Sequence, residues 1–392
     1  MYKSQILKKF LKGKRVTLLN IGPMSKNLVD VSIEISDKFN LPLTLIASRR
    51  QIDSKEFSGG YVNNWDTASF SKYVKSKSKK KKIFLARDHG GPWQNNLEIN
   101  GKYNLKSAMN SAKRSLKSDI DSGFDFLHLD TSIDPTGKKI RNSELFDRLF
   151  DLYEYCYSYS KSKKKDIDFE VGTEEQSGST NTPYELDYNL KKINNFCKKN
   201  NITKPTYVVV QAGTKVMEMQ NVGSFESFVR PKNETPVEIQ LPKMINICEK
   251  NGMMMKEHNT DYLTNESLSW HPKIGIHAAN VAPEFGVVET KAIITLMKKL
   301  KLNKLMNDFM EISYNSLKWE KWMLNNSKAT KKDKSVISGH YIFSKPEVKF
   351  ILHKVNLECN KKLMISSNKF IKDEIRKSIF RYLINFNMLR LK

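Results

Sequence analysis

Eight short apolar runs, most of them separated by helical patterns, constrain the fold of this chain more than any other feature. The runs are residues 15–20, 43–47, 83–86, 124–130, 167–171, 207–211, 253–257 and 273–277. Alternating strand and helix patterns are typical of parallel βα units, and eight such units predict a (β/α)8 TIM barrel. A doubly wound open sheet is the structural alternative, but the chain has no GxGxxG or GxxxxGK[ST] sequence to support it.

Polar residues follow the predicted strands at their carboxyl ends, where barrels of this kind place their chemistry. The third run ends in Asp88 and His89, followed by the turn sequence Gly90-Gly91-Pro92. A carboxylate beside an imidazole supplies a base and a metal ligand, the two parts of a metal-assisted proton-transfer site. The alternative is that Asp88 only caps the start of a helix.

The chain changes character at about residue 300. Residues 1–300 are expected to form the barrel and residues 301–392 a helical C-terminal extension. Within the extension, residues 300–324, 346–360 and 369–389 have helical patterns, and a charged loop is expected at 325–334. We expect these helices to pack on the barrel or on a partner subunit.

The composition limits the cellular compartments and the binding partners that are expected for this protein. The net charge of +25 lies largely in lysine runs between predicted elements, without any nucleic-acid-binding motif, so nucleic acid is disfavoured and anionic small substrates are favoured. The four cysteines form no CxxC pair, which fits free thiols in a reducing compartment. No apolar signal core or membrane-length run is present, so a cytoplasmic protein without a membrane partner is expected.

Several motifs in order resemble one enzyme family. They are Gly59-Gly60-Tyr61, Asp88 to Pro92, Gly123-Phe124 through His128-Leu129-Asp130, Gly172-Thr173-Glu174 and His258-Asn259-Thr260-Asp261-Tyr262. Together they resemble the Z-type (non-catalytic) subunit family of class II D-tagatose-1,6-bisphosphate aldolases. The resemblance covers roughly residues 15 to 300 in motif order and is weaker in the C-terminal helices.

The resemblance implies an aldolase-type barrel that acts on ketose phosphates. In catalytic relatives the Asp of the Asp-His pair transfers the proton and the adjacent His binds zinc; these roles fall on Asp88 and His89. The later histidine of the family falls on His258. A further histidine expected after the sixth strand is absent, because Gln211 stands there. A glutamine carbonyl is still an oxygen ligand, so Gln211 is included in the expected metal shell.

The expected chemistry needs a divalent metal and two carboxylates. A mixed nitrogen and oxygen shell suits Zn²⁺, our first expectation, but also Mn²⁺ or Co²⁺. Glu170 is expected to face Asp88 across the barrel mouth as the second catalytic carboxylate. Such a pair would cleave the C3–C4 bond of a ketose phosphate, or break and rejoin it as a 4-epimerase. The alternative is a barrel rim of hydrogen-bonded residues that has lost its metal.

Substrate contacts are expected from two regions. Arg49 and Arg50 follow the second strand, and arginine grips phosphate or carboxylate with two hydrogen bonds; a surface ion pair is the alternative. Asn259, Thr260 and Asn280 follow the last two predicted strands, where barrels commonly bind phosphate.

Three further residues near the strand ends have less definite roles. His128 alternates with Asp130 and shares its face of the strand, so it either points into the barrel or, as we expect, is structural. Asp130 is expected to hold His89 or a second cation, or to make a hydrogen bond at the rim. His277 either reaches the substrate from the end of the eighth run or has no role.

Two functions of different classes follow from the sequence. The first is a metal-dependent aldehyde-lyase of tagatose-bisphosphate aldolase type, or a sugar-phosphate 4-epimerase, forming an oligomer. The second is a non-catalytic subunit that stabilises a separate class II aldolase chain, which the replacement of a ligand histidine by Gln211 motivates.

Overall fold

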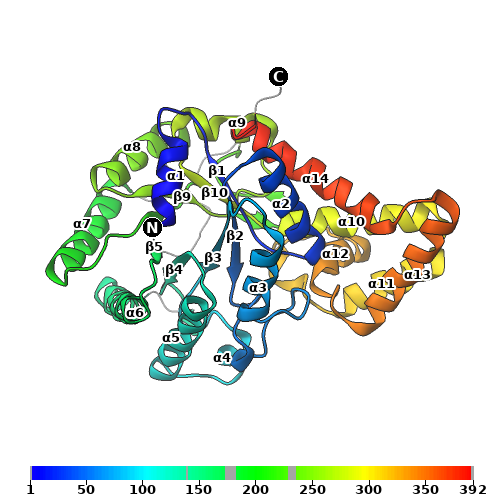
Figure 1. The fold of residues 1–392 in the computed structure, drawn as a ribbon, viewed down its shortest axis with the longest axis horizontal. Coiled ribbons are helices and arrows are strands. Elements are labelled where there is room, and N and C mark those ends of the chain that lie inside the picture. The colour runs from blue at the N-terminus through cyan, green and yellow to red at the C-terminus, as the bar shows by residue number, and fades with distance from the viewer. Residues whose placement is uncertain (1, 138–139, 173–181, 228–234, 390–392) are drawn as a thin grey trace.

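Eight parallel strands close into a barrel in this computed structural model, which describes residues 2–137, 140–172, 182–227 and 235–389 (Figure 1). The strands are β1 (Leu18–Ile21), β2 (Leu43–Ser48), β3 (Ile83–Asp88), β4 (Phe126–Asp130), β5 (Asp168–Gly172), β6 (Tyr207–Val209), β9 (Met254–Glu257) and β10 (Ala278–Val281). β1 pairs in parallel with both β2 and β10, which closes the sheet. The predicted (β/α)8 TIM barrel is therefore confirmed.

Helices surround the barrel and cover its outer face (Figure 1). The connections between strands contain α2 (Lys26–Phe39), α3 (Thr67–Lys77), α4 (Asn96–Asn100), α5 (Leu105–Ser122), α6 (Asn142–Ser162), α7 (Pro183–Lys199), α8 (Val237–Lys250) and α9 (Asn265–Ile274). The helix α10 (Pro283–Lys299) follows the last strand, and α1 (Lys3–Leu11) precedes the first. A small antiparallel hairpin, β7 (Val216–Met217) and β8 (Gln220–Asn221), lies in the β6–α8 connection.

Local sequence signals define the helix ends around the third and fourth strands. The side chain of Asn104 accepts a hydrogen bond from the backbone N–H of Ser107 and caps α5. Gly123 ends the helix with φ +74°, a left-handed conformation that glycine adopts without steric cost. Because β3 and β4 are covered by helices on one side and filled by side chains on the other, their apolar residues are buried on both faces.

The eighth strand lies later in the chain than predicted. Residues 273 and 274 end α9, which Gly275 terminates with φ +95°, and the strand begins at Ala278. The prediction at 273–277 was wrong because a short apolar run does not distinguish a helix end from a buried strand. His277 consequently precedes the strand: its Nδ1 accepts a hydrogen bond from the backbone N–H of Met255, and its Nε2 lies 3.3 Å from Glu249.

The C-terminal region is helical, as predicted, with different boundaries. The elements are α11 (Asn303–Asn315), α12 (Lys331–Ser338), α13 (Pro346–Leu363) and α14 (Ser367–Asn385). The single helix predicted for 300–324 ends at Asn315, and a 3₁₀ turn, η2 (Glu320–Trp322), follows it. The loop predicted for 325–334 contains the beginning of α12.

The last helix packs along the barrel. α14 lies beside α2 and α10 (Figure 1) and buries Ile375, Ile379 and Leu383 completely. Just beyond it, the carbonyl of Phe386 accepts a hydrogen bond of 3.1 Å from the backbone N–H of Thr17, directly before β1. No helix among the described residues combines the length and the apolar character that a bilayer crossing requires.

Truncation of a buried side chain on α14 tests how much this helix contributes to the barrel. Ile379→Ala should lower the free energy of unfolding by about 2–5 kcal/mol, because it leaves a cavity in a fully buried interface. Urea denaturation followed by circular dichroism measures the change. The exposed neighbour Lys377→Ala is the control; equal unfolding midpoints for both variants would show that α14 does not support the fold.

Candidate active site

Three histidines and one aspartate meet inside the carboxyl end of the barrel. Asp88 ends β3, His89 follows it, His128 lies within β4 and His258 follows β9. The three imidazole rings form a triangle with centroid separations of 5.4, 5.2 and 5.2 Å. One potential ligand atom from each of the four residues lies within 4.8 Å of the others. Residues far apart in the sequence therefore form one compact cluster.

The glycines after His89 allow this close approach. His89 has a left-handed backbone, with φ +46°, which turns the chain away from β3. The backbone N–H of Gly90 then donates a 2.8 Å hydrogen bond to the carbonyl of His128. A Cβ atom on Gly91 would lie 1.5 Å from the carbonyl oxygen of Asp130, so no larger residue fits there. A Cβ atom on Gly90 would likewise lie 2.6 Å from the carbonyl oxygen of His128, so both glycines are required for placing His89 beside β4.

Asp130 orients the His89 ring. Nδ1 of His89 donates a 2.6 Å hydrogen bond to Asp130, which also accepts hydrogen bonds from Gln94 and Ser132. In a neutral ring this bond leaves Nε2 of His89 available to a metal. Of the roles left open for Asp130 by the sequence, the structure shows the hydrogen bond to His89.

The carboxylate of Asp88 lies among the imidazoles. Its Oδ1 is 3.5 Å from Nδ1 of His128, 3.7 Å from Nε2 of His89 and 3.9 Å from Nε2 of His258. Burial opposes its ionisation, but the positive charges of the histidines hold the pKa of Asp88 well below its usual range. Burial likewise opposes the protonation of His89, but Asp88 and Asp130 raise the pKa of that imidazole to about 9.

Glu170 of β5 joins the cluster together with a buried lysine. Oε1 of Glu170 lies 3.3 Å from Nε2 of His258 and 3.9 Å from Nδ1 of His128. Its other oxygen, Oε2, accepts a 2.6 Å hydrogen bond from Nζ of Lys256. Against the effect of burial, the positive charges of Lys256 and His128 lower the pKa of Glu170. Glu170 is therefore ionised inside the barrel.

A cavity of about 350 Å³ lies over the cluster. Its walls include His89, His128 and His258, together with Arg50, Gln94, Asp130, Ser132, Ile133, Gly172, Val209, Asn259 and Trp322. Trp322 belongs to η2 and reaches the cavity from the C-terminal region. Most of the other lining residues lie at or just beyond the carboxyl ends of the strands, as expected for a TIM barrel site.

The residues predicted for the site are distributed between the cavity and the protein interior. Arg50 and Asn259 line the cavity. Arg49 does not: it is fully buried in ion pairs with Asp53 at 3.0 Å and Glu98 at 2.6 Å. Thr260 is buried too, and its hydroxyl donates to Glu257.

Two further predicted residues, Asn280 and Gln211, do not line the cavity over the cluster. The side-chain oxygen of Asn280, on β10, accepts a 3.1 Å hydrogen bond from Asn20 of β1. Gln211 is buried shortly after β6 and does not line the cavity over the cluster. Among the described residues, the place of a third imidazole is taken by His128, not by a residue following β6.

Sequence reasoning missed three residues of this site. His128 was expected to be structural, but alternation in the strand places it on the same barrel-facing side as Asp130, and this spacing was the available signal. Lys256 directly follows three methionines of a predicted buried strand, where a buried lysine implies a buried partner. Trp322 carried no signal, because only the packing of η2 brings it to the barrel mouth.

The cluster fits a divalent metal ion. Oδ1 of Asp88 and Nε2 of His128 are buried and have no hydrogen-bond partner among the described residues. Buried polar atoms without partners are costly unless something else satisfies them. Three imidazoles and a carboxylate are a donor set that transition metals such as Zn²⁺ favour. The observed His/Asp cluster could therefore bind a metal.

Comparison with known proteins shows the same fold in enzymes of sugar metabolism. No protein-family model matches the sequence, and no curated protein sequence matches it. Among solved structures, a probable tagatose 6-phosphate kinase from Sinorhizobium meliloti superposes with a TM-score of 0.74 at 13% identity, covering 94% of this chain and all of that one.

Two other solved structures share the barrel. A fructose-bisphosphate aldolase from Campylobacter jejuni has a TM-score of 0.57 and 10% identity over 99% of this chain and 96% of that one. A fructuronate-tagaturonate epimerase from Cohnella laeviribosi has a TM-score of 0.57 and 9% identity over 98% of this chain and 85% of that one. At sequence identities this low, the similarity to these structures shows a shared fold and nothing about activity.

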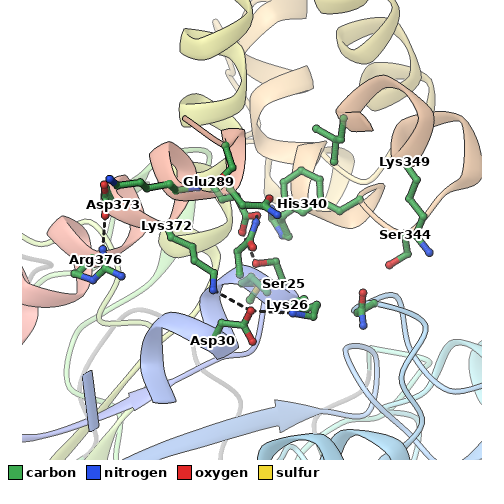
Figure 2. Close-up of a pocket in the computed structure, with 18 of the residues that line it drawn as sticks. Ser25, Lys26, Asp30, Glu289, His340, Ser344, Lys349, Lys372, Asp373 and Arg376 are labelled. Carbon is green, nitrogen blue, oxygen red and sulfur yellow. Dashed lines mark hydrogen bonds and ion pairs between the residues drawn. The ribbon is translucent and has the colours of Figure 1, made fainter. Parts of the chain in front are cut away.

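A second cavity, of about 680 Å³, lies between the barrel and the C-terminal helices (Figure 2). Its lining comes largely from α2, α10, α13 and α14, with His340 and Ser344 from the segment between α12 and α13, and includes none of the four cluster residues. Asp30 pairs there with Lys26 at 2.8 Å and with Lys372 at 3.1 Å. Glu289 accepts hydrogen bonds from Ser25 and Asn27.

The buried carboxyl of Glu289 predicts a pH-dependent stability. Burial raises its pKa to about 7, although hydrogen bonds from Ser25 and Asn27 oppose the change. Because the pKa of Glu289 is higher in the folded state, its protonation stabilises the folded protein. This stabilisation is complete below the unfolded pKa of about 4.5 and is lost as the pH rises through about 7. Glu289→Gln should therefore be more stable than wild type at pH 8, by on the order of 1–3 kcal/mol, and closer to it at pH 5.

Urea unfolding at the two pH values measures this difference. The exposed Glu347→Gln is the matched control and should follow wild type at both. A gain for Glu289→Gln that is the same at pH 5 and pH 8 would contradict the assignment of the pKa.

Proposed function

We propose that this protein is a metal-dependent aldolase or epimerase that acts at C4 of a ketose phosphate. The observation that carries the proposal is the cluster of three imidazoles beside two ionised carboxylates, Asp88 and Glu170, under one cavity. The shared fold with an aldolase and a sugar epimerase is consistent with it. His89, His128 and His258 would hold the metal, with Zn²⁺ the first choice and Mn²⁺ or Co²⁺ as alternatives.

A bound divalent ion would supply Lewis-acid polarisation of the substrate carbonyl. The protein's own part is proton transfer. Asp88 is ionised and has a buried oxygen without a hydrogen-bond partner among the described residues, so it can accept the proton of the C4 hydroxyl. Loss of that proton accompanies cleavage of the C3–C4 bond and leaves an aldehyde at C4.

Glu170 is the second carboxylate of the proposed reaction. Both Asp88 and Glu170 lie beside Nδ1 of His128, at 3.5 and 3.9 Å. Lys256 keeps Glu170 ionised and fixes one of its oxygens, which leaves Oε1 facing the histidines. In the proposed reaction, each of these two carboxylates would serve one face of the aldehyde. Release of the aldehyde gives a lyase, and its rotation followed by rejoining gives a 4-epimerase.

The imidazole of His128 is evidence against the alternative function, a non-catalytic subunit. That alternative was motivated by Gln211 at a position where a ligand histidine was expected. His128 supplies a third imidazole to the cluster, so the donor set does not depend on Gln211. The cluster therefore supports an active enzyme over a subunit that only stabilises a separate aldolase chain.

Metal binding is the first test. Protein loaded with Zn²⁺, Mn²⁺ or Co²⁺ should retain about one ion per chain after desalting, as expected for a single site with three protein ligands. His128→Ala should weaken binding by more than about tenfold, because even losses outside the ligand shell have effects of that size. Competition with a chromophoric chelator measures the affinity.

The exposed His353→Ala is the control for that titration. A wild-type chain that binds none of the three ions would refute the metal assignment. If His128→Ala binds like wild type, His128 is not a ligand.

Turnover is the second test, with C6 and C7 ketose phosphates as substrates. Triose release and inversion at C4 should be monitored together, since they separate a lyase from an epimerase. Asp88→Asn should lower kcat by about 10²–10⁴, the usual contribution of a general base, while its fold remains that of wild type. The exposed Asp308→Asn is the matched control; absence of both products with metal-loaded wild type would favour the subunit alternative.

A further inference from the structure

The two adjacent arginines after β2 have opposite surroundings. Arg49 is fully buried and is neutralised by Asp53 and Glu98. Arg50 lines the cavity over the histidine cluster, and its Nε is buried without a hydrogen-bond partner among the described residues. No carboxylate of the described part of the chain forms an ion pair with Arg50. A guanidinium that faces a cavity without an anion is positioned to receive one from a ligand.

The C-terminal region adds a second cation and an aromatic wall beside Arg50. Trp322 lines the same cavity. Nζ of Lys321 lies 4.6 Å from the centre of the Trp322 ring and 5.4 Å from that of Tyr341. Partial desolvation and the positive charges of Arg50 and Lys318 lower the pKa of Lys321 to about 7, although Lys321 is exposed to solvent. Arg50 and Trp322 thus face the cavity, and Lys321 lies against the Trp322 ring without lining the cavity itself.

This wall is held in place by the barrel. Nε1 of Trp322 donates a 3.1 Å hydrogen bond to the hydroxyl of Tyr341, and its carbonyl accepts a 2.7 Å bond from the backbone N–H of Glu218, between β7 and β8. The hairpin is itself tied to the site, since Asn221 donates to the carbonyl of Asn259 at 2.8 Å. The segment around η2 is thus positioned with the loop that follows β9.

We propose that Arg50 and Trp322, with Lys321 packed against the Trp322 ring, form a subsite for the anionic end of the substrate. This inference rests on the proposed function, in which the carbonyl and C4 lie at the histidine cluster. The anion is a phosphate or a carboxylate on a carbon remote from that cluster. The lining of the cavity combines the three imidazoles and Asp130 with the guanidinium of Arg50, and this arrangement orients a sugar that has a single charged end. The C-terminal region thereby contributes to substrate selection.

Anion binding to the full-length, metal-free protein tests the subsite without requiring turnover. Inorganic phosphate and acetate are the two probes, because they distinguish a phosphate-ended from a carboxylate-ended substrate. Binding is followed by tryptophan fluorescence and by isothermal titration calorimetry. We expect one of the two anions to bind at millimolar concentration, with a fluorescence change that disappears in Trp322→Phe while the calorimetric signal remains.

The variants decide which residues carry the binding. Arg50→Gln should weaken the binding of that anion by at least tenfold, and Lys321→Gln should weaken it less, because Lys321 is exposed. The exposed Arg141→Gln is the matched control and should bind like wild type. Circular dichroism and the melting temperature establish that each variant is folded.

Two results would overturn the proposal: binding of neither anion by the folded wild type, or equal affinities for wild type and Arg50→Gln. Failure of the proposed function is distinguishable from both. In that case phosphate or acetate would still bind in an Arg50-dependent manner, while metal-loaded protein would turn over no ketose phosphate.

Discussion

Closure of the parallel barrel is the constraint on which the rest of the structure depends. Because β1 pairs with both β2 and β10, every strand of the sheet points toward one rim. Asp88, His128 and His258 are separated by 40 and 130 residues in the sequence, yet closure brings their side chains together. A sheet left open would place the residues of β3 and β9 far apart, and no such cluster would form.

The buried carboxylates inside this rim are compensated by the imidazoles and the lysine that surround them. Asp88, Asp130 and Glu170 are ionised in a buried environment, and each has an imidazole or ammonium beside it. Lys256 compensates Glu170, which leaves three imidazoles to share two carboxylates. Burying charge in this way is costly, and it persists where the surrounding structure holds every partner in place. A divalent ion would fit that arrangement by satisfying the atoms that now lack partners.

The C-terminal region has two physical roles in the structure. α14 covers part of the barrel with a fully buried apolar face. The segment ending in Trp322 reaches the other end of the barrel and forms a wall of the cavity. Beside α14 lies the second cavity, where Asp30 pairs with Lys26 and Lys372. Packing on the barrel therefore links the shape of the site to residues beyond the last strand.

The sequence by itself determined the barrel, most of its strands and the presence of Asp88 and His89 at the end of β3. Alternation of apolar runs and helical patterns is a local property, so it was readable without the structure. The same holds for Asp88, His89 and His258, whose positions after apolar runs placed them on one rim. The eighth strand was misplaced because a helix end and a buried strand look alike over a few residues.

Only the tertiary structure decided which neighbours share the site. Arg49 and Arg50 are adjacent in sequence, yet one is neutralised in the interior and the other faces the cavity. His128 and Lys256 became site residues because the strands that carry them face the barrel interior next to Asp88 and Glu170. Trp322 lines the cavity because η2 packs at the mouth of the barrel. Such contacts depend on distances between segments remote in the chain, and no local pattern encodes those distances.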